Sequence, residues 1–252
     1  MANIIIKAAN FSHYFGTNQT LKNINLDVYQ NEILGIIGPA GSGKSTFLRA
    51  LNRLNDLVVG SRVEGTLTID DQDIYAPEMS LVELRRKLGM VFATPTPLPR
   101  SIYENVAFGP KMAGMHNKTK LHELVTDCLN KTTLLEEVKD RLDTSALKLS
   151  GGQQQRLCVA RILALKPEFI LLDEPCSGLD PISTMKIEES LRELKKDYTI
   201  ILVTNNTKQA ARVADRTAFF LSGELIEIGQ TEKIFTTPAD QRTNDYISGR
   251  FG

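Results

Sequence analysis

The stretch GPAGSGKST, residues 38–46, constrains the fold of this chain more than any other part of the sequence. It follows the continuously apolar run EILGIIG (32–38), which is typical of a strand buried on both faces of a sheet. It also opens a helix that we expect from about Lys44 to Leu54. A glycine-rich turn in that context surrounds phosphate groups with backbone N–H groups at the positive end of the helix dipole. The sequence therefore predicts a P-loop that binds a nucleotide.

Two side chains of this loop have specific chemical roles. Lys44 supplies a point charge to the phosphates, and the hydroxyl of Ser45 is a ligand for Mg²⁺. A glycine-rich turn that matches by accident is the alternative, and the strand before it and the helix after it argue against that alternative. The predicted nucleotide-binding residues of the loop are Gly38, Pro39, Ala40, Gly41, Ser42, Gly43, Lys44, Ser45 and Thr46.

A second apolar run, FILLDEP (169–175), ends in two acidic residues. Asp173 is expected at the carboxyl end of a central strand, where α/β sheets place their ligands, and it can hold Mg²⁺ through water. Glu174 lies one residue further out and can accept a proton from, or orient, an attacking water. The alternative is an acidic strand end that faces solvent, and the accompanying P-loop argues against it.

Strands and helices alternate in both halves of the chain, which predicts a parallel sheet covered on both faces. The early stretches 21–28 and 62–70 read as further strands, and the first of them alternates apolar and polar residues. A helical block from about Ser101 to Leu165 interrupts the pattern, and the last residues, 236–252, show no clear period. The predicted fold class is α/β with a mostly parallel core sheet.

Composition excludes some functions. The 30 basic and 30 acidic residues cancel, so the chain has no general attraction to nucleic acid or to anionic lipid. The three cysteines have no metal-binding spacing and read as reduced thiols of a cytosolic protein. No apolar run approaches the roughly 18 residues that a spanning helix needs. If the protein works at a membrane, we therefore expect something else to hold it there.

The stretch LSGGQQQRLCVARIL (149–163) begins with a serine and two glycines at a helix start. Ser150 can cap the helix, and Gly151 and Gly152 allow a phosphate to approach the backbone closely. Taken alone, these residue types describe an ordinary helix entry equally well. Its position between the P-loop and the strand that ends in Asp173 is what favours a functional role over an ordinary helix entry.

A P-loop, a helical insertion that ends in LSGGQ and an apolar strand that ends in DE, in this order, resemble the ATP-binding subunit of ABC transporters. The resemblance implies one ABC ATPase domain over residues 1–252, a P-loop NTPase with an antiparallel β subdomain near the N-terminus and a helical signature-motif subdomain at approximately 92–165. It implies ATP and Mg as cofactors. SGLD (177–180) matches the D-loop through Asp180. Phe15 matches the aromatic that stacks on adenine, with Tyr14 as the fallback and a core aromatic as the alternative.

The family works as dimers, and this implies the partners of the chain. The signature residues of one copy, Ser150, Gly151, Gly152 and Gln153, would complete the site of a second ATP-binding subunit, so we expect a homodimer. Transmembrane permease subunits would hold the pair peripherally at the cytoplasmic face of the cell membrane. The resemblance also implies an extracytoplasmic phosphate-binding protein as an indirect partner, and we expect no contact with nucleic acid.

Three further stretches narrow the resemblance to the Pst-type subunit that drives bacterial phosphate import. They are residues 51–75, DEPCSGLDP (173–181) and the ending DYISGRFG (245–252). The choice of phosphate rests on this resemblance alone, because no residue of an ATP site contacts the transported solute.

Two positions depart from the family pattern. The family has Gln after the strand that ends in Val91-Phe92, where it helps to ligate Mg²⁺ and orient water, and this chain has Ala93. The family has His after Val-Thr in the stretch 201–215, where it reaches the γ-phosphate, and this chain has Asn205. Asparagine keeps a neutral donor and acceptor, whereas alanine keeps neither. We therefore expect ATP binding with reduced hydrolysis, unless water, Thr94 or Glu174 covers the losses.

Three functions remain open at this point. The first is an ATPase that powers phosphate import. The second is a nucleotide-gated dimerisation or regulatory module with little turnover, which the two changed positions favour. The third is a soluble ABC-type ATPase of repair or translation, which the lack of tandem domains, coiled coils and basic patches disfavours.

Overall fold

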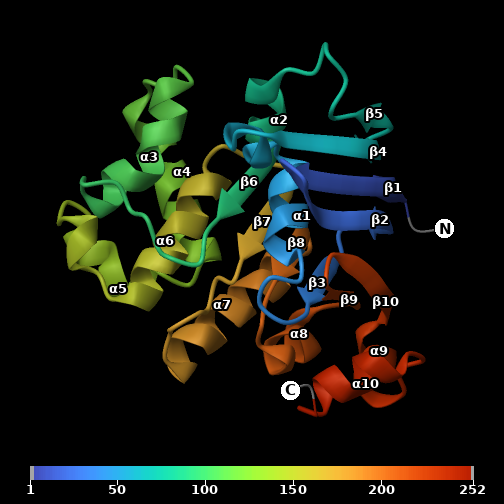
Figure 1. The fold of residues 1–252 in the computed structure, drawn as a ribbon. Helices are drawn as coiled ribbons and strands as arrows, with labels where there is room; N and C mark the ends of the chain where they lie inside the picture. Colours follow the sequence, from blue (N-terminus) through green and yellow to red (C-terminus); the bar gives the residue numbers. More distant parts are fainter. Residues whose placement is uncertain (1–2, 251–252) are drawn as a thin grey trace.

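The computed structural model describes residues 3–250, which form two β-sheets with helices around and beside them (Figure 1). The antiparallel sheet contains, from edge to edge, β2 (Asn18–Tyr29), β1 (Ile4–Phe15), β4 (Ser61–Ile69) and β5 (Gln72–Asp73). The second sheet contains β10 (Glu224–Gln230), β9 (Arg216–Leu221), β3 (Ile33–Ile37), β8 (Thr199–Val203), β7 (Phe169–Asp173) and β6 (Leu88–Val91).

The second sheet is parallel from β9 to β6, and β10 pairs antiparallel with β9 at one edge. Together with the antiparallel sheet formed by the N-terminal strands, this confirms the predicted α/β fold class. The parallel pairing brings the carboxyl ends of β3, β7 and β8 to one edge of the sheet, because β3 pairs with β8 and β8 with β7.

The central strands are buried on both faces, as their continuous apolar runs predict. Their side chains alternate between two hydrophobic clusters, in keeping with the two-residue period of a strand. Leu34, Leu171 and Ile201 belong to the cluster that contains α1 (Lys44–Leu51) and the antiparallel sheet. Their neighbours in sequence, such as Ile170 and Ile200, belong to the cluster that contains α7 (Pro181–Leu194) and the helical block.

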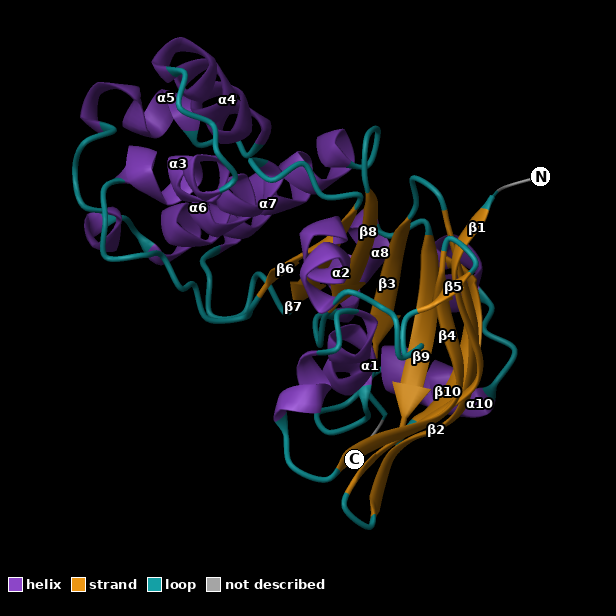
Figure 2. Ribbon diagram, turned by 90° about the horizontal axis from the view of Figure 1, so that it is seen from above, coloured by secondary structure: helices purple, strands orange, loops and turns teal. Residues whose placement is uncertain are grey.

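The helical block stands beyond β6, the edge strand of the parallel sheet (Figure 2). It contains α3 (Ile102–Met112), α4 (Lys118–Lys131), α5 (Leu135–Val138) and α6 (Gly151–Leu163). The remaining helices are α2 (Leu81–Lys87) before β6, α8 (Thr207–Val213), which packs on β3, and α9 (Thr231–Thr236) and α10 (Gln241–Ile247) near the C-terminus. Within residues 3–250, no helix is long and apolar enough to cross a membrane.

Two local expectations need correction. The helix expected to reach Leu54 ends at Leu51, because Arg53 adopts a left-handed conformation (φ 55°) that starts a 3₁₀ turn over Leu54–Leu57. The tail shows no periodicity, yet α10 forms there. Asp240 caps it by accepting a hydrogen bond from the Arg242 backbone N–H, and the ring of Tyr246 stacks on Phe219 with centroids 4.9 Å apart. Tyr246 and its neighbour Ile247 are the apolar residues of α10 that pack on the hydrophobic cluster of Phe219, and two adjacent residues do not make a helical period.

Gly65 lies opposite the irregular part of β1, where the β1–β4 register shifts between Ala9 and Ser12. Its φ is +79°, and a Cβ there would lie 2.2 Å from the carbonyl oxygen of Asn10. We expect Gly65→Ala to lower the free energy of unfolding by about 2–4 kcal/mol, from backbone strain and the clash together. Urea unfolding measures the change. Gly114→Ala is the matched control, because Gly114 has φ +91° but no heavy atom within 4 Å of a built Cβ. Equal losses in the two variants would contradict the clash.

Candidate functional site

A cavity of about 520 Å³ opens at the carboxyl edge of the parallel sheet, between the P-loop and the start of β2. The lining residues are Asn18, Gln19, Thr20, Ala40, Gly41, Ser42, Gly43, Lys44, Ser45, Thr46, Glu174, Asn205, Ser222 and Gly223. Most of the predicted P-loop residues, Glu174 and Asn205 therefore meet at one place. The start of β2 and the β9–β10 turn were not identified from the sequence as parts of the site. The turn is held beside the P-loop by long-range contacts such as the hydrogen bond from the Gly223 N–H to the Ser42 carbonyl oxygen (3.1 Å).

Lys44 is held inside the loop by the backbone. Its Nζ donates to the carbonyl oxygens of Gly38 and Pro39, each at 2.8 Å. Burial lowers the pKa of Lys44, while Glu174 and Asp173 act in the opposite direction. The ammonium is thus presented at the cavity by two predicted residues, Gly38 and Pro39, that do not line it themselves.

The P-loop also contains a buried hydroxyl group, that of Ser42. Ser42 is 2% exposed, and within the part of the chain that the structure describes its Oγ has no hydrogen-bond partner. A buried polar group without a partner costs free energy that a bound polar ligand can recover. Gly41 (φ +75°) and Gly43 (φ +99°) take conformations that favour glycine, so the backbone of the loop has the shape of a phosphate cradle.

Ser45 and Asp173 are joined across the cavity wall. The Ser45 hydroxyl donates to Oδ1 of Asp173 at 2.6 Å, and the guanidinium of Arg49 contacts Oδ2 at 3.2 Å. A hydroxyl and a carboxylate oxygen at hydrogen-bond distance are donors that suit Mg²⁺, which prefers oxygen ligands together with substrate phosphates. The donor set therefore fits the predicted Mg²⁺ site.

Glu174 follows Asp173 in a left-handed conformation (φ 52°), which is uncommon for a residue with a Cβ and marks a constrained position. Its backbone N–H donates to the carbonyl oxygen of Val203 at 2.8 Å, so it is fixed to the end of β8. Burial raises the pKa of the Glu174 carboxyl, and Lys44 and hydrogen bonding with Asn205 oppose this rise. Asn205 therefore contacts the carboxylate expected to handle the attacking water.

Tyr14 and Phe15, the two candidates for stacking on adenine, differ in whether another side chain already covers the ring. Tyr14 is already engaged, because the guanidinium of Arg62 lies 3.6 Å from its ring centroid and its hydroxyl donates to Glu64 at 3.1 Å. Phe15 lies at the end of β1, half-buried, with its ring edge-to-face against His13 at 4.5 Å. Neither ring lines the cavity, but Phe15 is closer in sequence to the lining residues Asn18–Thr20.

Ala93 is half-buried in the loop after β6 and is absent from the cavity lining. Three side chains of the helical block hold this loop. Gln155 donates to the carbonyl oxygen of Phe92 at 2.8 Å, Arg161 donates to that of Thr96 at 2.9 Å, and Asn105 accepts from the Leu98 N–H at 2.7 Å. These three residues were not identified from the sequence. The sequence offered no clear signal, because Gln155 stands within the polar run 153–156 and Arg161 lies on a different face of the helix.

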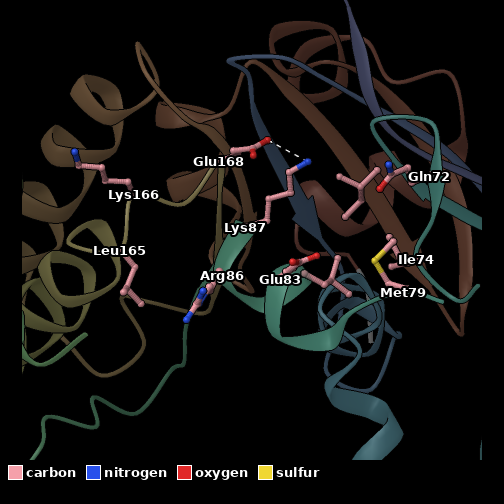
Figure 3. A pocket seen from close by; sticks show the side chains of 11 residues that line it. Gln72, Ile74, Met79, Glu83, Arg86, Lys87, Leu165, Lys166 and Glu168 are labelled. Atoms are coloured by element: carbon pink, nitrogen blue, oxygen red, sulfur yellow. Dashed lines mark ion pairs between the residues drawn. The ribbon is translucent and has the colours of Figure 1, made fainter. Parts of the chain in front are cut away.

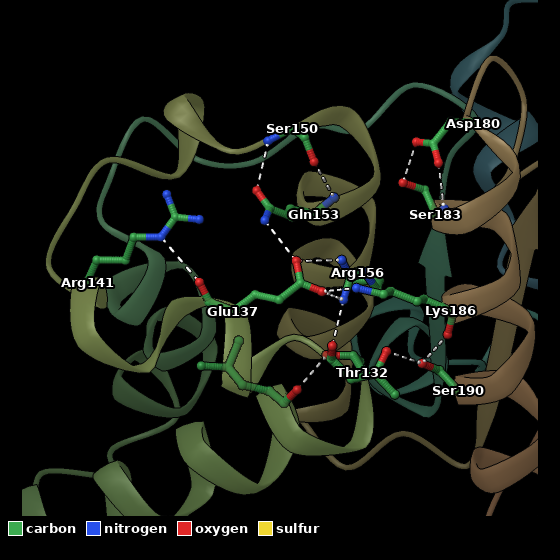
Figure 4. A network of polar contacts seen from close by, with 12 residues as sticks. Thr132, Glu137, Arg141, Ser150, Gln153, Arg156, Asp180, Ser183, Lys186 and Ser190 are labelled. Carbon is green, nitrogen blue, oxygen red and sulfur yellow. Dashed lines mark hydrogen bonds and ion pairs between the residues drawn. The ribbon is translucent and has the colours of Figure 1, made fainter.

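The signature residues lie outside the cavity of their own chain. Ser150 and Gln153 form a capping box, in which the Ser150 Oγ accepts from the Gln153 N–H at 3.3 Å and the Gln153 Oε1 accepts from the Ser150 N–H at 3.0 Å. Gly152 packs against α7, because a Cβ there would lie 2.4 Å from the Ser183 Oγ. Asp180 caps α7 by accepting from the Ser183 N–H and Oγ (Figure 4).

A second hollow, of about 380 Å³, lies at the opposite edge of the parallel sheet (Figure 3). Its wall includes Lys87 and Glu168, which immediately precede β6 and β7, and these two side chains form an ion pair at 3.4 Å. Parallel α/β sheets bind their ligands at the carboxyl ends of the strands. The hollow at the amino ends is therefore not the candidate nucleotide site.

Comparison with known proteins agrees with this geometry. The family model described as ABC transporter matches residues 21–177, which is more than half of the chain. The chain therefore belongs to the ABC transporter family, as an ATPase domain.

Two solved structures share the fold. CbiO1 from Clostridium perfringens, described as part of the ABC transporter complex CbiONQ, has a TM-score of 0.82 and 26% identity over 98% of this chain and 97% of its own. A bacterial Atm1-family ABC exporter with ATP bound has a TM-score of 0.82 and 24% identity over 100% of this chain and 43% of its own. The second likeness shows the fold alone.

Phe15 and Tyr14 can be separated by substitution. We expect Phe15→Ala to weaken ATP binding by about 1–3 kcal/mol, the contribution of one base–aromatic stack, and Tyr14→Ala to leave it nearly unchanged because Arg62 covers that ring. Titration with a fluorescent ATP analogue measures both affinities, and tripolyphosphate, which lacks the base, serves as the control ligand. A loss for Tyr14→Ala alone would reverse the assignment.

Proposed function

We propose that this chain is the ATP-binding and ATP-hydrolysing subunit that powers import of inorganic phosphate through a membrane ABC transporter. The observation that carries the ATPase assignment is the Ser45–Asp173 hydrogen bond of 2.6 Å, with Lys44 and Glu174 in the adjoining cavity. The proposed organisation is one ABC ATPase domain over residues 1–252, with a helical subdomain at approximately 92–165 inserted in the α/β core.

In this proposal the P-loop binds the phosphates of ATP through its backbone N–H groups and Lys44. Ser45 and Asp173 hold Mg²⁺, which neutralises phosphate charge when it is bound. Glu174 orients the attacking water and accepts its proton, and the raised pKa of its carboxyl suits that role. Asn205 holds Glu174 in place at the position where the family has a histidine.

A second copy completes each site in this proposal. The first-turn N–H groups of a helix have no partner within the helix, and those of Gly151 and Gly152 are therefore available to an anion. Because the signature residues do not line the cavity of their own chain, the ATP that they contact is assigned to the partner copy. ATP that binds the closed dimer better than the open one drives closure, and hydrolysis resets it.

The proposed partners are permease subunits, which hold the dimer at the cytoplasmic face of the membrane. The loop 93–100 would transmit motion to them, since Gln155 and Arg161 fasten it to the signature helix. The CbiO1 structure is described as part of an ABC transporter complex, which supports an assembly of this kind. Phosphate as the solute rests on the resemblance of residues 51–75, 173–181 and 245–252 to Pst-type subunits; residues 251–252 lie outside the described part of the chain.

Hydrolysis is the step that the two departures weaken. We expect Ala93→Gln with Asn205→His to raise the single-turnover rate by about 10² to 10³, since removal of one polar group that contacts developing charge costs that much. The gains of the single variants will not add, because the groups belong to one cooperating site. Single-turnover hydrolysis with purified protein tests this. A wild-type rate equal to that of the double variant would contradict weakened hydrolysis.

A nucleotide-gated dimerisation or regulatory module with little turnover is the second candidate. The observation that favours it is Ala93, whose methyl group cannot replace the polar contact expected at the start of the loop. Turnover by the chain assembled with its permease separates the two functions: a regulatory module stays slow in the assembly, whereas a transport ATPase accelerates.

Phosphate uptake tests the solute. We expect the chain, expressed with its permease in cells that lack their own phosphate-import ATPase, to restore uptake of radiolabelled phosphate. Lys44→Ala is the control, because it removes the charge that binds the nucleotide phosphates. Uptake equal to that of the Lys44→Ala control, together with intact ATP binding by the wild type, would exclude phosphate import and leave the ATPase assignment standing.

A further inference from the structure

Glu137 of α5 is not among the predicted site residues, yet it lies at the centre of a network of polar contacts (Figure 4). Its Oε1 accepts from Nη1 of Arg156 at 2.9 Å and from Nζ of Lys186 at 2.6 Å. Its Oε2 accepts from Nη2 of Arg156 at 3.1 Å and from Nε2 of Gln153 at 2.8 Å. Four donors from two other helices, α6 and α7, thus converge on one carboxylate.

The carboxylate of Glu137 balances the charge of a buried guanidinium. The side chain of Arg156 is 3% exposed, so its guanidinium depends on Glu137 for charge compensation. Hydrogen bonds from Arg156, Lys186 and Gln153 outweigh burial and lower the pKa of Glu137 to about 2. Glu137 therefore remains ionised throughout the physiological range.

The contacts of Glu137 link the signature turn to the D-loop helix. Gln153 uses its Oε1 to hold the Ser150 N–H and its Nε2 to reach Glu137, so the carboxylate fixes the orientation of the amide that closes the capping box. Lys186 comes from α7, the helix that Asp180 caps. The same two helices also touch at Gly152 and Ser183.

We propose that Glu137 is a positioning residue that fastens the signature turn Ser150–Gln153 to α7, so that both are presented to the partner copy as one rigid surface. This inference rests on the proposed function, in which ATP is shared between two copies. Glu137 itself contacts no nucleotide in this scheme and acts through Gln153 and Lys186.

Glu137→Gln tests the proposal with little change of shape. A glutamine has one oxygen for four donors, and its amide nitrogen would face donors instead of accepting from them. The background is Glu174→Gln, which removes the proposed base so that bound ATP is not hydrolysed during the measurement. In it we expect the ATP concentration for half-maximal dimerisation to rise by about tenfold or more, as for a lost charged hydrogen bond. Analytical ultracentrifugation measures dimerisation, and a fluorescent ATP analogue measures P-loop affinity at protein concentrations where the chain is monomeric. We expect the P-loop affinity to stay unchanged.

Glu136→Gln is the matched control, because the neighbouring carboxylate is 76% exposed and contacts Lys139. Lys186→Met provides a second test, because it keeps the Arg156–Glu137 pair. If Glu137→Gln does not fold, Lys186→Met is the variant that tests the proposal. We expect a shift in the same direction.

Three outcomes would overturn the inference. One is dimerisation by Glu137→Gln, or by Lys186→Met where that variant decides, that matches Glu136→Gln. Another is an equal loss of P-loop affinity and dimerisation, which indicates general destabilisation. If the Glu174→Gln parent itself fails to dimerise with ATP, the sandwich dimer of the proposed function falls first, and the inference falls with it.

Discussion

Burial of β3, β7 and β8 on both faces is the constraint on which the rest of the structure depends. The interior side chains of these strands enter hydrophobic clusters and carry no chemistry, so functional groups collect where the strands end. The parallel pairing brings those ends to one edge, and there Ser45 meets Asp173 although 128 residues separate them in sequence. The short Ser45–Asp173 contact is thus a consequence of sheet topology, and the cavity beside it follows from the glycine-rich turn after β3.

The sequence is most informative where function and local structure use the same residues. GPAGSGKST predicts a turn, a helix start and a phosphate site at once, and FILLDE predicts a buried strand and its acidic end. The sequence does not reveal contacts between side chains that lie far apart in the chain and meet only when the helices pack. Gln155 and Arg161 read as polar residues of a helix, and only the packed structure shows that they hold the loop after β6. The contacts of Glu137 are equally hidden, because their partners come from two other helices, α6 and α7.

Ala93 and Asn205 depart from the family pattern, but the hydrogen bonds that hold the surrounding loop and Glu174 are present. The loop that begins at Ala93 keeps its fastenings to the helical block, and Asn205 still contacts Glu174. In the proposed function, nucleotide binding and the link to the permease therefore depend on residues other than those that changed. On that proposal hydrolysis and coupling can be separated, because coupling depends on groups that pack between helices and not on the groups that line the cavity.

Gly152 shows how an intramolecular contact limits what genetics can reveal. The space beside its Cα is filled by the Ser183 side chain of the same chain, so an added methyl group would act as a wedge between α6 and α7. If the signature turn contacts ATP as proposed, loss of activity in a variant of this glycine has two origins that a phenotype cannot separate: a blocked approach of ATP and a forced separation of two helices. Gly151, whose nearest neighbour for a built Cβ is Leu179 at 3.4 Å, is the glycine of the pair at which a substitution reports mainly on the ligand.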